Sequence, residues 1–255
     1  MALLFGVKAD KIDWRDRPYN FARDTNPRDV VDLRPWASPV EDQLHLGSCV
    51  GQSVVGAYEL MINKQFPGQF TDLSRLFVYY NARALDNMIS EDVGAYVRDG
   101  VKAVDKWGVC AEKIWPYLIK QFALPPSAES YLDASKRMIK NYYRINSVED
   151  IIDSLNADYP VIIGMKVYNG FYDLESPGVY TLPMPKASDD VIGGHAVTLV
   201  GYDIPNKRFL ARNSFGEDWA MKGYFWIPFD YADIDFMDCW MFEVNMLTSQ
   251  SNQNT

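Results

Sequence analysis

Cysteine and histidine are scarce in this chain of 255 residues. Its three cysteines are too few for a disulfide framework, and their odd number leaves at least one thiol unpaired. We therefore expect an intracellular or cytoplasmic location rather than a secreted one. Only His45 and His195 could supply an imidazole, so a hydrolase that needs an imidazole base must use one of them.

Long apolar runs and clusters of basic residues are also missing. No stretch approaches the ~20 apolar residues of a membrane span, and the start, residues 1–7, is too short for the apolar part of a signal peptide. The formal charge of −9, from 25 basic and 34 acidic residues, disfavours nucleic acid as a partner. No cysteine–histidine spacing suits zinc, and no glycine-rich phosphate motif occurs in the right context. We expect no membrane, nucleic acid, metal or cofactor; the sequence leaves the oligomeric state open.

The pattern of apolar residues changes near the middle of the chain. Helical spacing predicts helices at about 49–65, 74–84, 97–107 and 127–139, with a short one after Ser147. Apolar runs separated by glycine and proline then predict strands at 161–167, 196–200, 208–212, 224–227 and 240–244. Helices first and strands second indicate an α+β fold, with a helical lobe, an antiparallel sheet lobe and a cleft between them.

Three residues have a sequence context that suits chemistry. Cys49 begins a predicted helix, where unpaired N–H groups and the helix dipole favour a thiolate. His195 enters a strand behind two glycines, and Asn213 follows the next strand, where it could hold an imidazole in one orientation. Each residue alone has an ordinary alternative: a buried thiol, a core histidine and a turn asparagine. The combination is much more specific than its parts.

Four segments, in this order, resemble the papain family of cysteine peptidases. The matching residues are Gln43, Gly47-Ser48-Cys49, His195-Ala196-Val197 and Asn213-Ser214-Phe215-Gly216. The family places its histidine and asparagine roughly 130–150 residues after the cysteine. Here His195 follows Cys49 by 146 residues and Asn213 by 164, slightly beyond that range. Weaker likenesses at 32–43, 108–117 and 219–224 extend the resemblance over about residues 29–245.

The resemblance implies a role for each matched residue. Cys49 is expected as the nucleophile and His195 as its acid–base partner, oriented by Asn213. Gln43 is expected to donate to the oxyanion beside the backbone N–H of Cys49. Segment matching places substrate-binding residues at Gly94, Gly164, Met165, Gly194, Ala196, Phe215 and Trp219. Small, apolar pocket walls suit a bulky apolar substrate side chain.

The implied activity is that of a thiol protease, a hydrolase that cuts peptide or protein substrates through a thioester acyl-enzyme. The expected fold is the two-lobed papain-like one, with the active site in the cleft. The sequence leaves two alternatives open: an acyl transferase or deamidase on the same scaffold, and a catalytically silent binding protein. A complete set of Cys49, His195, Asn213 and Gln43 argues against the silent alternative. Cleavage specificity and the choice between endopeptidase and exopeptidase also stay open.

Several positions depart from the family pattern. Leu46 stands where the family has a cysteine, so one family disulfide is missing, and Val50 and Phe215 replace tryptophans. Phe215 keeps an aromatic plane that can shield the bond between Asn213 and His195. The acidic pairs 91–92 and 189–190 are interpreted as solvated loop residues.

The chain divides into three predicted parts. Residues 29–247 form the peptidase domain, with 29–140 mainly helical and 141–247 mainly β; residues 248–255 are a frayed tail. Residues 1–28 form an arm in which aromatic residues stand among charges, a pattern suited to packing on a surface. We expect the arm either to cover part of the cleft and regulate access, or to brace the second lobe.

Overall fold

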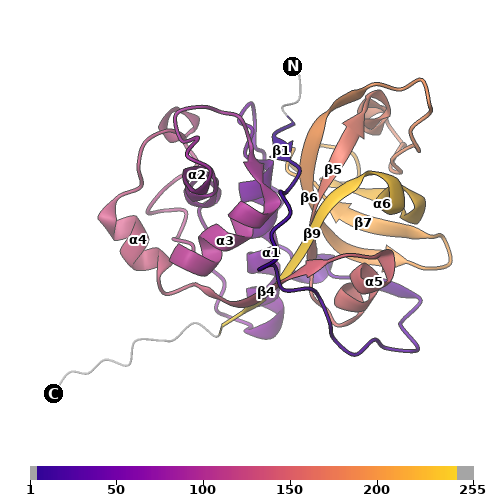
Figure 1. Ribbon diagram of the computed structural model, residues 1–255, viewed down its shortest axis with the longest axis horizontal. Coiled ribbons are helices and arrows are strands. Elements are labelled where there is room, and N and C mark those ends of the chain that lie inside the picture. The colour runs from indigo at the N-terminus through magenta and orange to yellow at the C-terminus, as the bar shows by residue number, and fades with distance from the viewer. Residues whose placement is uncertain (1–4, 246–255) are drawn as a thin grey trace.

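The first half of the chain forms a helical lobe. The structure, a computed structural model, describes residues 5–245. Figure 1 shows the four helices of this lobe on one side of the molecule: α1 (Cys49–Gln65), α2 (Arg75–Leu85), α3 (Val97–Trp107) and α4 (Ala128–Ala134). Ser74 caps α2, since its hydroxyl accepts a hydrogen bond from the N–H of Phe77 at 3.1 Å. Ser48 precedes α1 but makes no such cap; its hydroxyl lies 2.6 Å from that of Tyr117.

The second half forms a seven-stranded sheet in the order β4-β9-β5-β6-β7-β8, with β2 paired to β6. All its pairings are antiparallel, and the α+β prediction is thus confirmed. The strands are β2 (Val30–Asp32), β4 (Ile139–Ile145), β5 (Val161–Tyr168), β6 (Val191–Asp203), β7 (Arg208–Arg212), β8 (Tyr224–Pro228) and β9 (Phe236–Val244). Helices α5 (Val148–Asn156) and α6 (Phe229–Asp235) accompany the sheet, and 3-10 turns occur at Arg34–Trp36, Ile119–Gln121 and Asn169–Glu175.

The clearest differences from the sequence predictions are at α4, β6 and β9, the last of which begins at Phe236, four residues before the predicted start at 240. The helix expected over 127–139 ends at Ala134, and Ile139–Ile145 forms the edge strand β4. That strand exists because it pairs with β9, about a hundred residues later, which no local periodicity could show. Strand β6 begins at Val191, five residues before the predicted start at 196.

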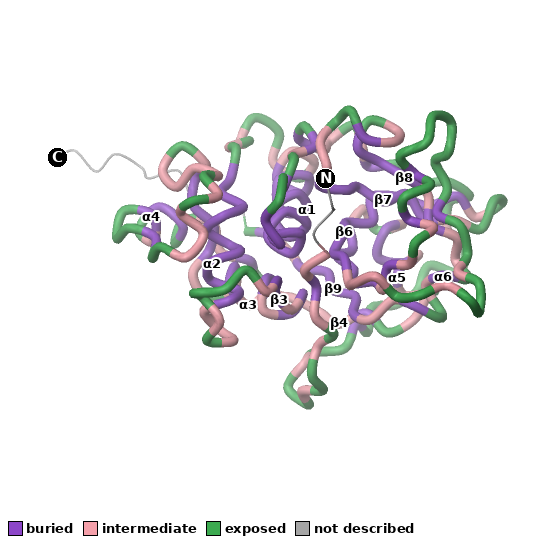
Figure 2. The backbone as a smooth tube through the Cα atoms, turned by 90° about the horizontal axis from the view of Figure 1, so that it is seen from above, coloured by how far each residue is buried: buried purple, intermediate pink, exposed green. Residues whose placement is uncertain are grey.

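Each lobe has its own apolar core, and strand β5 faces both. Ile162 belongs to the core of the helical lobe, whereas Ile163 belongs to the core of the sheet lobe. Strand β9 likewise contributes Trp240 and Phe242 to the helical lobe. Figure 2 shows buried backbone over most of α1 and of β6, where the lobes meet. Residues placed at this junction are therefore held by rigid elements from both sides.

The three cysteines lie in separate places. Cys49 begins α1, Cys110 packs with Phe77 and Ala134, and Cys239 belongs to the core of the sheet lobe. All three are buried free thiols, which agrees with a disulfide-poor member of the family. Between residues 5 and 245, no helix is long and apolar enough to cross a membrane.

Candidate active site

Cys49 is the first residue of α1 and is fully buried. Burial raises the pKa of its thiol, while backbone groups of Ala196 and Gly6 within hydrogen-bonding reach lower it. The net direction is upward, opposite to the thiolate expected from the helix start. In this closed arrangement burial therefore favours the neutral thiol.

His195 lies on β6 and faces Asn213, which directly follows β7. The imidazole Nε2 is 2.8 Å from Asn213 Oδ1. Since an amide oxygen only accepts, Nε2 carries the hydrogen, and Nδ1 of the neutral ring has a free lone pair. Within the described chain, Nδ1 has no hydrogen-bond partner. Burial lowers the pKa of His195 to about 4, although the Asn213 bond acts in the opposite direction.

Aromatic rings cover the pair of His195 and Asn213. Phe215 stacks on the imidazole with ring centroids 5.1 Å apart and an interplanar angle of 21°. Trp219 packs edge-on against Phe215 at 5.7 Å, and it stacks on Phe171 at 5.8 Å. Phe215 thus lies where the sequence placed a shield against water. Trp219 is a second layer behind it and contributes mainly to the sheet-lobe core.

Gln43 is fully buried beside the same loop as Asn213. Its Oε1 accepts from the hydroxyl of Ser214 at 2.6 Å, and its Nε2 donates to the carbonyl of Leu46 at 3.0 Å. The hydroxyl of Tyr117 donates to the backbone carbonyl of Gln43 at 2.9 Å. These bonds fix the carboxamide in one orientation, next to the loop that leads into Cys49.

The predicted catalytic residues are therefore brought together from three elements. The thiol of Cys49 is within hydrogen-bonding reach of the backbone at Ala196, the neighbour of His195. The backbone N–H of Gln43 donates at 2.8 Å to the carbonyl of Ser214, the neighbour of Asn213. His45, in contrast, is exposed on the loop before α1. The catalytic roles themselves stay predictions.

The arm occupies the cleft at this site. Its strand β1 (Val7–Lys8) pairs in parallel with β3 (Ala95–Tyr96), and Figure 1 shows it between the two lobes. The carbonyl of Gly6 accepts from the N–H of Ala95 at 2.9 Å. The ring of Phe5 lies edge-on to His195, with centroids 5.6 Å apart. The arm therefore covers both the thiol and the imidazole.

Glycines make this close approach possible. A Cβ added at Gly94 would lie 1.5 Å from the carbonyl oxygen of Gly6, and one at Gly6 would lie 2.6 Å from that of Gly47. At Gly194 it would lie 2.6 Å from the carbonyl oxygen of Val7. Gly94 and Gly194, both predicted to bind substrate, thus form the floor on which the arm's backbone lies.

The side chain of Val7 fills a small apolar pocket. A Cβ added at Gly164 would lie 3.3 Å from one Cγ atom of Val7, and a Cβ added at Gly194 would lie 2.7 Å from the other. The methyl group of Met237 closes the same pocket. It lies 3.8 Å from the Cβ added at Gly164 and 3.1 Å from the Cβ added at Gly194. The sequence analysis did not find Met237, because the single apolar residue before a predicted strand carries no chemical signature.

Two further residues predicted to bind substrate belong to the lobe cores. Ala196 packs in the core of the helical lobe, beside Cys49. Met165 is fully buried in the core of the sheet lobe, and its role in substrate binding stays a prediction. Alternate residues of a strand face opposite sides: Gly164 is paired with Ala196, and Met165 with His195.

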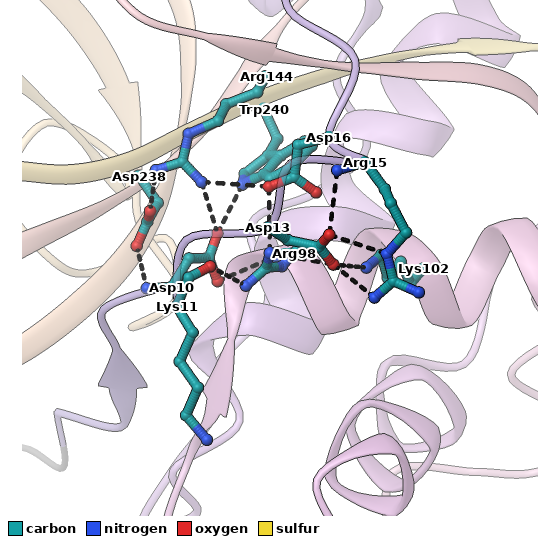
Figure 3. A network of polar contacts seen from close by, with 10 residues as sticks. All are labelled: Asp10, Lys11, Asp13, Arg15, Asp16, Arg98, Lys102, Arg144, Asp238 and Trp240. Atoms are coloured by element: carbon teal, nitrogen blue, oxygen red, sulfur yellow. Dashed lines mark hydrogen bonds and ion pairs between the residues drawn. The ribbon is translucent and has the colours of Figure 1, made fainter.

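Charged residues anchor the arm to the helical lobe. Figure 3 shows Arg98 of α3 reaching the arm. Arg98 forms an ion pair with Asp16 at 3.1 Å and donates to the carbonyl of Lys11. A second, longer ion pair joins Lys102 of α3 to Asp13 at 3.5 Å.

The same stretch of arm is anchored to the sheet lobe. The indole N–H of Trp240 donates to Asp10 at 2.8 Å, and the backbone N–H of Asp10 donates to Asp238 at 2.6 Å (Figure 3). Arg144 of β4 pairs with Asp238 at 2.7 Å and with Asp16 at 3.6 Å. We call Asp10, Asp13, Asp16, Arg98, Arg144 and Asp238 the clamp. The clamp binds residues 10–16 of the arm to both lobes, directly after residues 5–8, which lie in the cleft.

A fold of this kind, with a cysteine at a helix start and a histidine–asparagine pair on the facing sheet, defines the papain-like class. A model of the papain family of cysteine proteases matches residues 27–241. The chain belongs to that family.

Comparisons with individual proteins agree. An uncharacterized peptidase C1-like protein of Acanthamoeba polyphaga mimivirus is 36% identical over 214 residues, covering 80% of this chain and 68% of that protein. Chymopapain of Carica papaya is 26% identical over 212 residues; the match covers 81% of this chain and only 56% of chymopapain. Xylellain, a cysteine protease from Xylella fastidiosa, superposes with a TM-score of 0.87 at 30% identity, covering 95% and 96% of the two chains.

Proposed function

We propose that the chain hydrolyses peptide bonds through a thioester, with Cys49 as the nucleophile. The observation that carries the proposal is the bond between His195 Nε2 and Asn213, which leaves Nδ1 without a partner on a residue whose neighbour, Ala196, has its backbone within reach of the thiol. In this mechanism Nδ1 takes the proton of Cys49, and the sulfur attacks the substrate carbonyl. The backbone N–H of Cys49 and the carboxamide of Gln43 stabilise the oxyanion.

The remaining steps use the same groups. His195 gives its proton to the leaving amine, the C–N bond breaks, and the acyl group stays on sulfur as a thioester. His195 then takes a proton from water, whose oxygen attacks the thioester, and the acid product and the thiol are released. The ring stays oriented throughout, because Asn213 holds Nε2 and Phe215 covers the bond.

The proposed activity is that of an endopeptidase. The segment at Cys49 is an internal stretch of the arm, since Gly6 is followed by a chain that continues along α3. The cleft holds Phe5 on one side of Gly6 and Val7 on the other, and a cleft occupied on both sides of the thiol suits cleavage within a chain. A reducing location is part of the proposal, supported by the three free thiols.

The pocket of Val7 supports a preference for branched aliphatic substrate side chains. Its walls are Gly164, Gly194, Met237 and Val97, which offer no charged partner. We expect peptides with valine or leucine at the pocket position to be cleaved at least ~10-fold faster than those with aspartate, because burying an unpaired charge costs several kcal/mol. Profiling of cleavage sites in a denatured proteome measures this, with the Cys49→Ala chain as control. Equal cleavage of both classes would refute the assignment of the pocket.

We further propose that the arm has two functions in two parts. Residues 5–8 lie in the cleft and exclude substrate. Residues 16–28 brace the sheet lobe: the N–H of Tyr19 donates to the carbonyl of Arg144 at 2.7 Å, and its hydroxyl donates to the buried carboxylate of Asp153 at 2.7 Å. Regulation and bracing, which the sequence offered as alternatives, therefore coexist in this proposal.

The clamp makes closure sensitive to pH. Burial and the neighbouring Asp238 raise the pKa of Asp10 to about 7, while Trp240 and Arg98 oppose the shift. A raised pKa means that the docked arm binds the proton more tightly than the free arm. This contribution to docking is fully present below the ordinary aspartate value of 3.8 and is lost as the pH rises through about 7.

We therefore expect the arm to open more readily at pH 8 than at pH 5. Asp238→Asn removes the second carboxylate, lowers the pKa of Asp10 and should flatten this pH dependence. The measurement is the ratio of kcat/KM between the wild-type and Asp238→Asn chains across pH 5–8, which cancels the pH dependence of catalysis itself. The ratio should rise with pH; a constant ratio would show that the carboxyl pair does not control docking.

A further inference from the structure

Asp92 connects the loop before Cys49 with the edge that pairs with the arm. The backbone N–H of Gly47 donates to both oxygens of Asp92, at 3.0 and 3.1 Å. The hydroxyl of Tyr79 donates to the same carboxylate at 2.5 Å and accepts from the N–H of Gly94 at 3.2 Å. Asp92 is an exposed loop residue, as the sequence analysis interpreted it. Its carboxylate in addition joins three segments.

The two ends of this bridge lie at functional places. Gly47 belongs to the loop that carries Gln43 and ends at the N–H of Cys49, the two donors proposed for the oxyanion. Gly94 precedes Ala95, whose N–H binds the backbone of the arm at 2.9 Å. One carboxylate and one phenol therefore set the position of the oxyanion donors relative to the edge that pairs with a peptide.

The bridge is rigid. Tyr79 is fully buried on α2, and the guanidinium of Arg83 covers its ring at 4.1 Å from the centroid. Arg83 also donates to the carbonyls of Ile89 and Glu91 at 2.9 Å, which holds the loop that carries Asp92. Burial and Asp92 raise the pKa of Tyr79, so the phenol stays protonated and donates to the carboxylate.

The loop has little freedom to move away from the bridge. A Cβ added at Gly47 would lie 3.1 Å from Asp92 Oδ1 and 3.5 Å from the hydroxyl of Tyr79. No disulfide ties this loop down, since all three cysteines are free. The hydrogen bonds of Asp92 and those of Tyr117 on the other flank of the loop take that place.

We propose that Asp92 and Tyr79 are positioning residues for peptide hydrolysis. Asp92 holds the Gln43–Cys49 loop in the position where the carboxamide of Gln43 and the N–H of Cys49 can donate to the oxyanion. Tyr79 holds the Gly94–Ala95 edge in the position where it pairs with the substrate backbone. Neither side chain touches the reacting atoms. The inference rests on the proposed function and goes beyond it by separating the two tasks between two residues.

The test uses the full-length chain with Val7→Asp, which displaces the arm, as the reference. Into it we introduce Asp92→Ala, Asp92→Asn, Tyr79→Phe and, as a matched control, Glu91→Ala, whose side chain enters none of these contacts. Each chain is assayed for kcat and KM on a peptide substrate. Alkylation of Cys49 by iodoacetamide is measured in parallel, because that reaction develops no oxyanion.

Asp92→Ala should lower kcat by about 10- to 100-fold, since misplacement of an oxyanion donor costs part of the 10²–10³-fold lost on removing one. Its KM should change by less than about threefold and its alkylation rate by less than about twofold. Asp92→Asn keeps one acceptor oxygen and should recover most of kcat. Tyr79→Phe should instead raise KM by about 3- to 10-fold with kcat nearly unchanged.

A role limited to fold stability predicts a different pattern. Hydrolysis and alkylation would then fall together, kcat and KM would not separate between the two positions, and asparagine would rescue nothing; any of these results overturns the inference. A reference chain that is alkylated at Cys49 but hydrolyses no peptide refutes the proposed function, and the inference with it.

Discussion

Replacing Val7 with aspartate is expected to raise the peptide-hydrolysing activity of the full-length chain by about 10²-fold. Val7 is 9% exposed in its pocket, and complete burial of a valine contributes ~1.5–3 kcal/mol. An aspartate forfeits this contribution and adds the cost of burying a charge without a partner. A loss of ~2.7 kcal/mol in docking shifts the equilibrium between closed and open arm by about 100-fold.

Two matched variants separate closure from bracing. Ile12→Asp places the same charge on a fully exposed residue of the arm and should change neither activity nor melting temperature. Tyr19→Ala removes the buried bond to Asp153 and should lower the melting temperature by several degrees, at ~2–4 °C per kcal/mol for a chain of this size. It should not activate hydrolysis. Activation by Ile12→Asp as large as that by Val7→Asp would contradict occlusion of the cleft.

Replacing Cys49 with alanine in the arm-displaced chain is expected to reduce hydrolysis by at least about 10⁴-fold, the scale of loss when a nucleophile is removed. His195→Ala should cost a similar factor, because the thiol then has no group to take its proton. The two losses should not add, since the residues act as one unit. The measurement is kcat/KM on a peptide substrate, with thermal unfolding as the check that the fold is intact.

His45→Ala is the matched control for the second histidine. His45 is exposed and precedes α1, so we expect nearly full activity. Retention of a tenth of the reference activity by Cys49→Ala, a loss of only ~1.4 kcal/mol in transition-state stabilisation, would contradict its role as nucleophile. Loss of activity in His45→Ala with retention in His195→Ala would refute the pair.

The sequence predicted the elements that depend on local pattern, and it singled out candidate catalytic residues, whose roles stay predictions. Helices α1, α2 and α3 lie where apolar periodicity and the signals at their ends place them. Four residues stand out, because a carboxamide, a thiol, an imidazole and a second carboxamide in this order have few other reasons to occur: Gln43, Cys49, His195 and Asn213. Their shared location follows from the family resemblance, not from spacing alone.

What the sequence could not predict depends on contacts between distant segments. The route of the arm is fixed by the pairing of β1 with β3 and by Asp10, whose partners Asp238 and Trp240 lie more than 220 residues away. The pairing of Met165 with His195, and its burial in the sheet-lobe core, depend on the register between two distant strands. The exposed carboxylate of Asp92 showed no sign of its hydrogen bonds, because its partners at Gly47 and Tyr79 come from separate segments.

The protonation state of the catalytic pair is the least local property of all. A helix start favours a thiolate, yet burial raises the pKa of Cys49, against the opposing effect of the backbone at Gly6, and burial lowers the pKa of His195, whose ring lies against Phe5. The closed arm therefore favours the neutral thiol and imidazole in addition to excluding substrate. Displacing the arm returns water to the site, and we expect the reactive ion pair to form there.

The central claim is that the arm covers a reactive pair formed by the thiol of Cys49 and the imidazole of His195. The most direct test is the alkylation of Cys49 by iodoacetamide at pH 6, followed by mass spectrometry. Cys110 serves as an internal control, because burial raises its pKa to about 12. The account predicts rapid modification of Cys49 in the Val7→Asp chain, slow modification in the wild-type chain, and loss of the rapid reaction when His195→Ala is added to Val7→Asp. Equal rates at Cys49 in the wild-type and Val7→Asp chains, unaffected by His195→Ala, would contradict it.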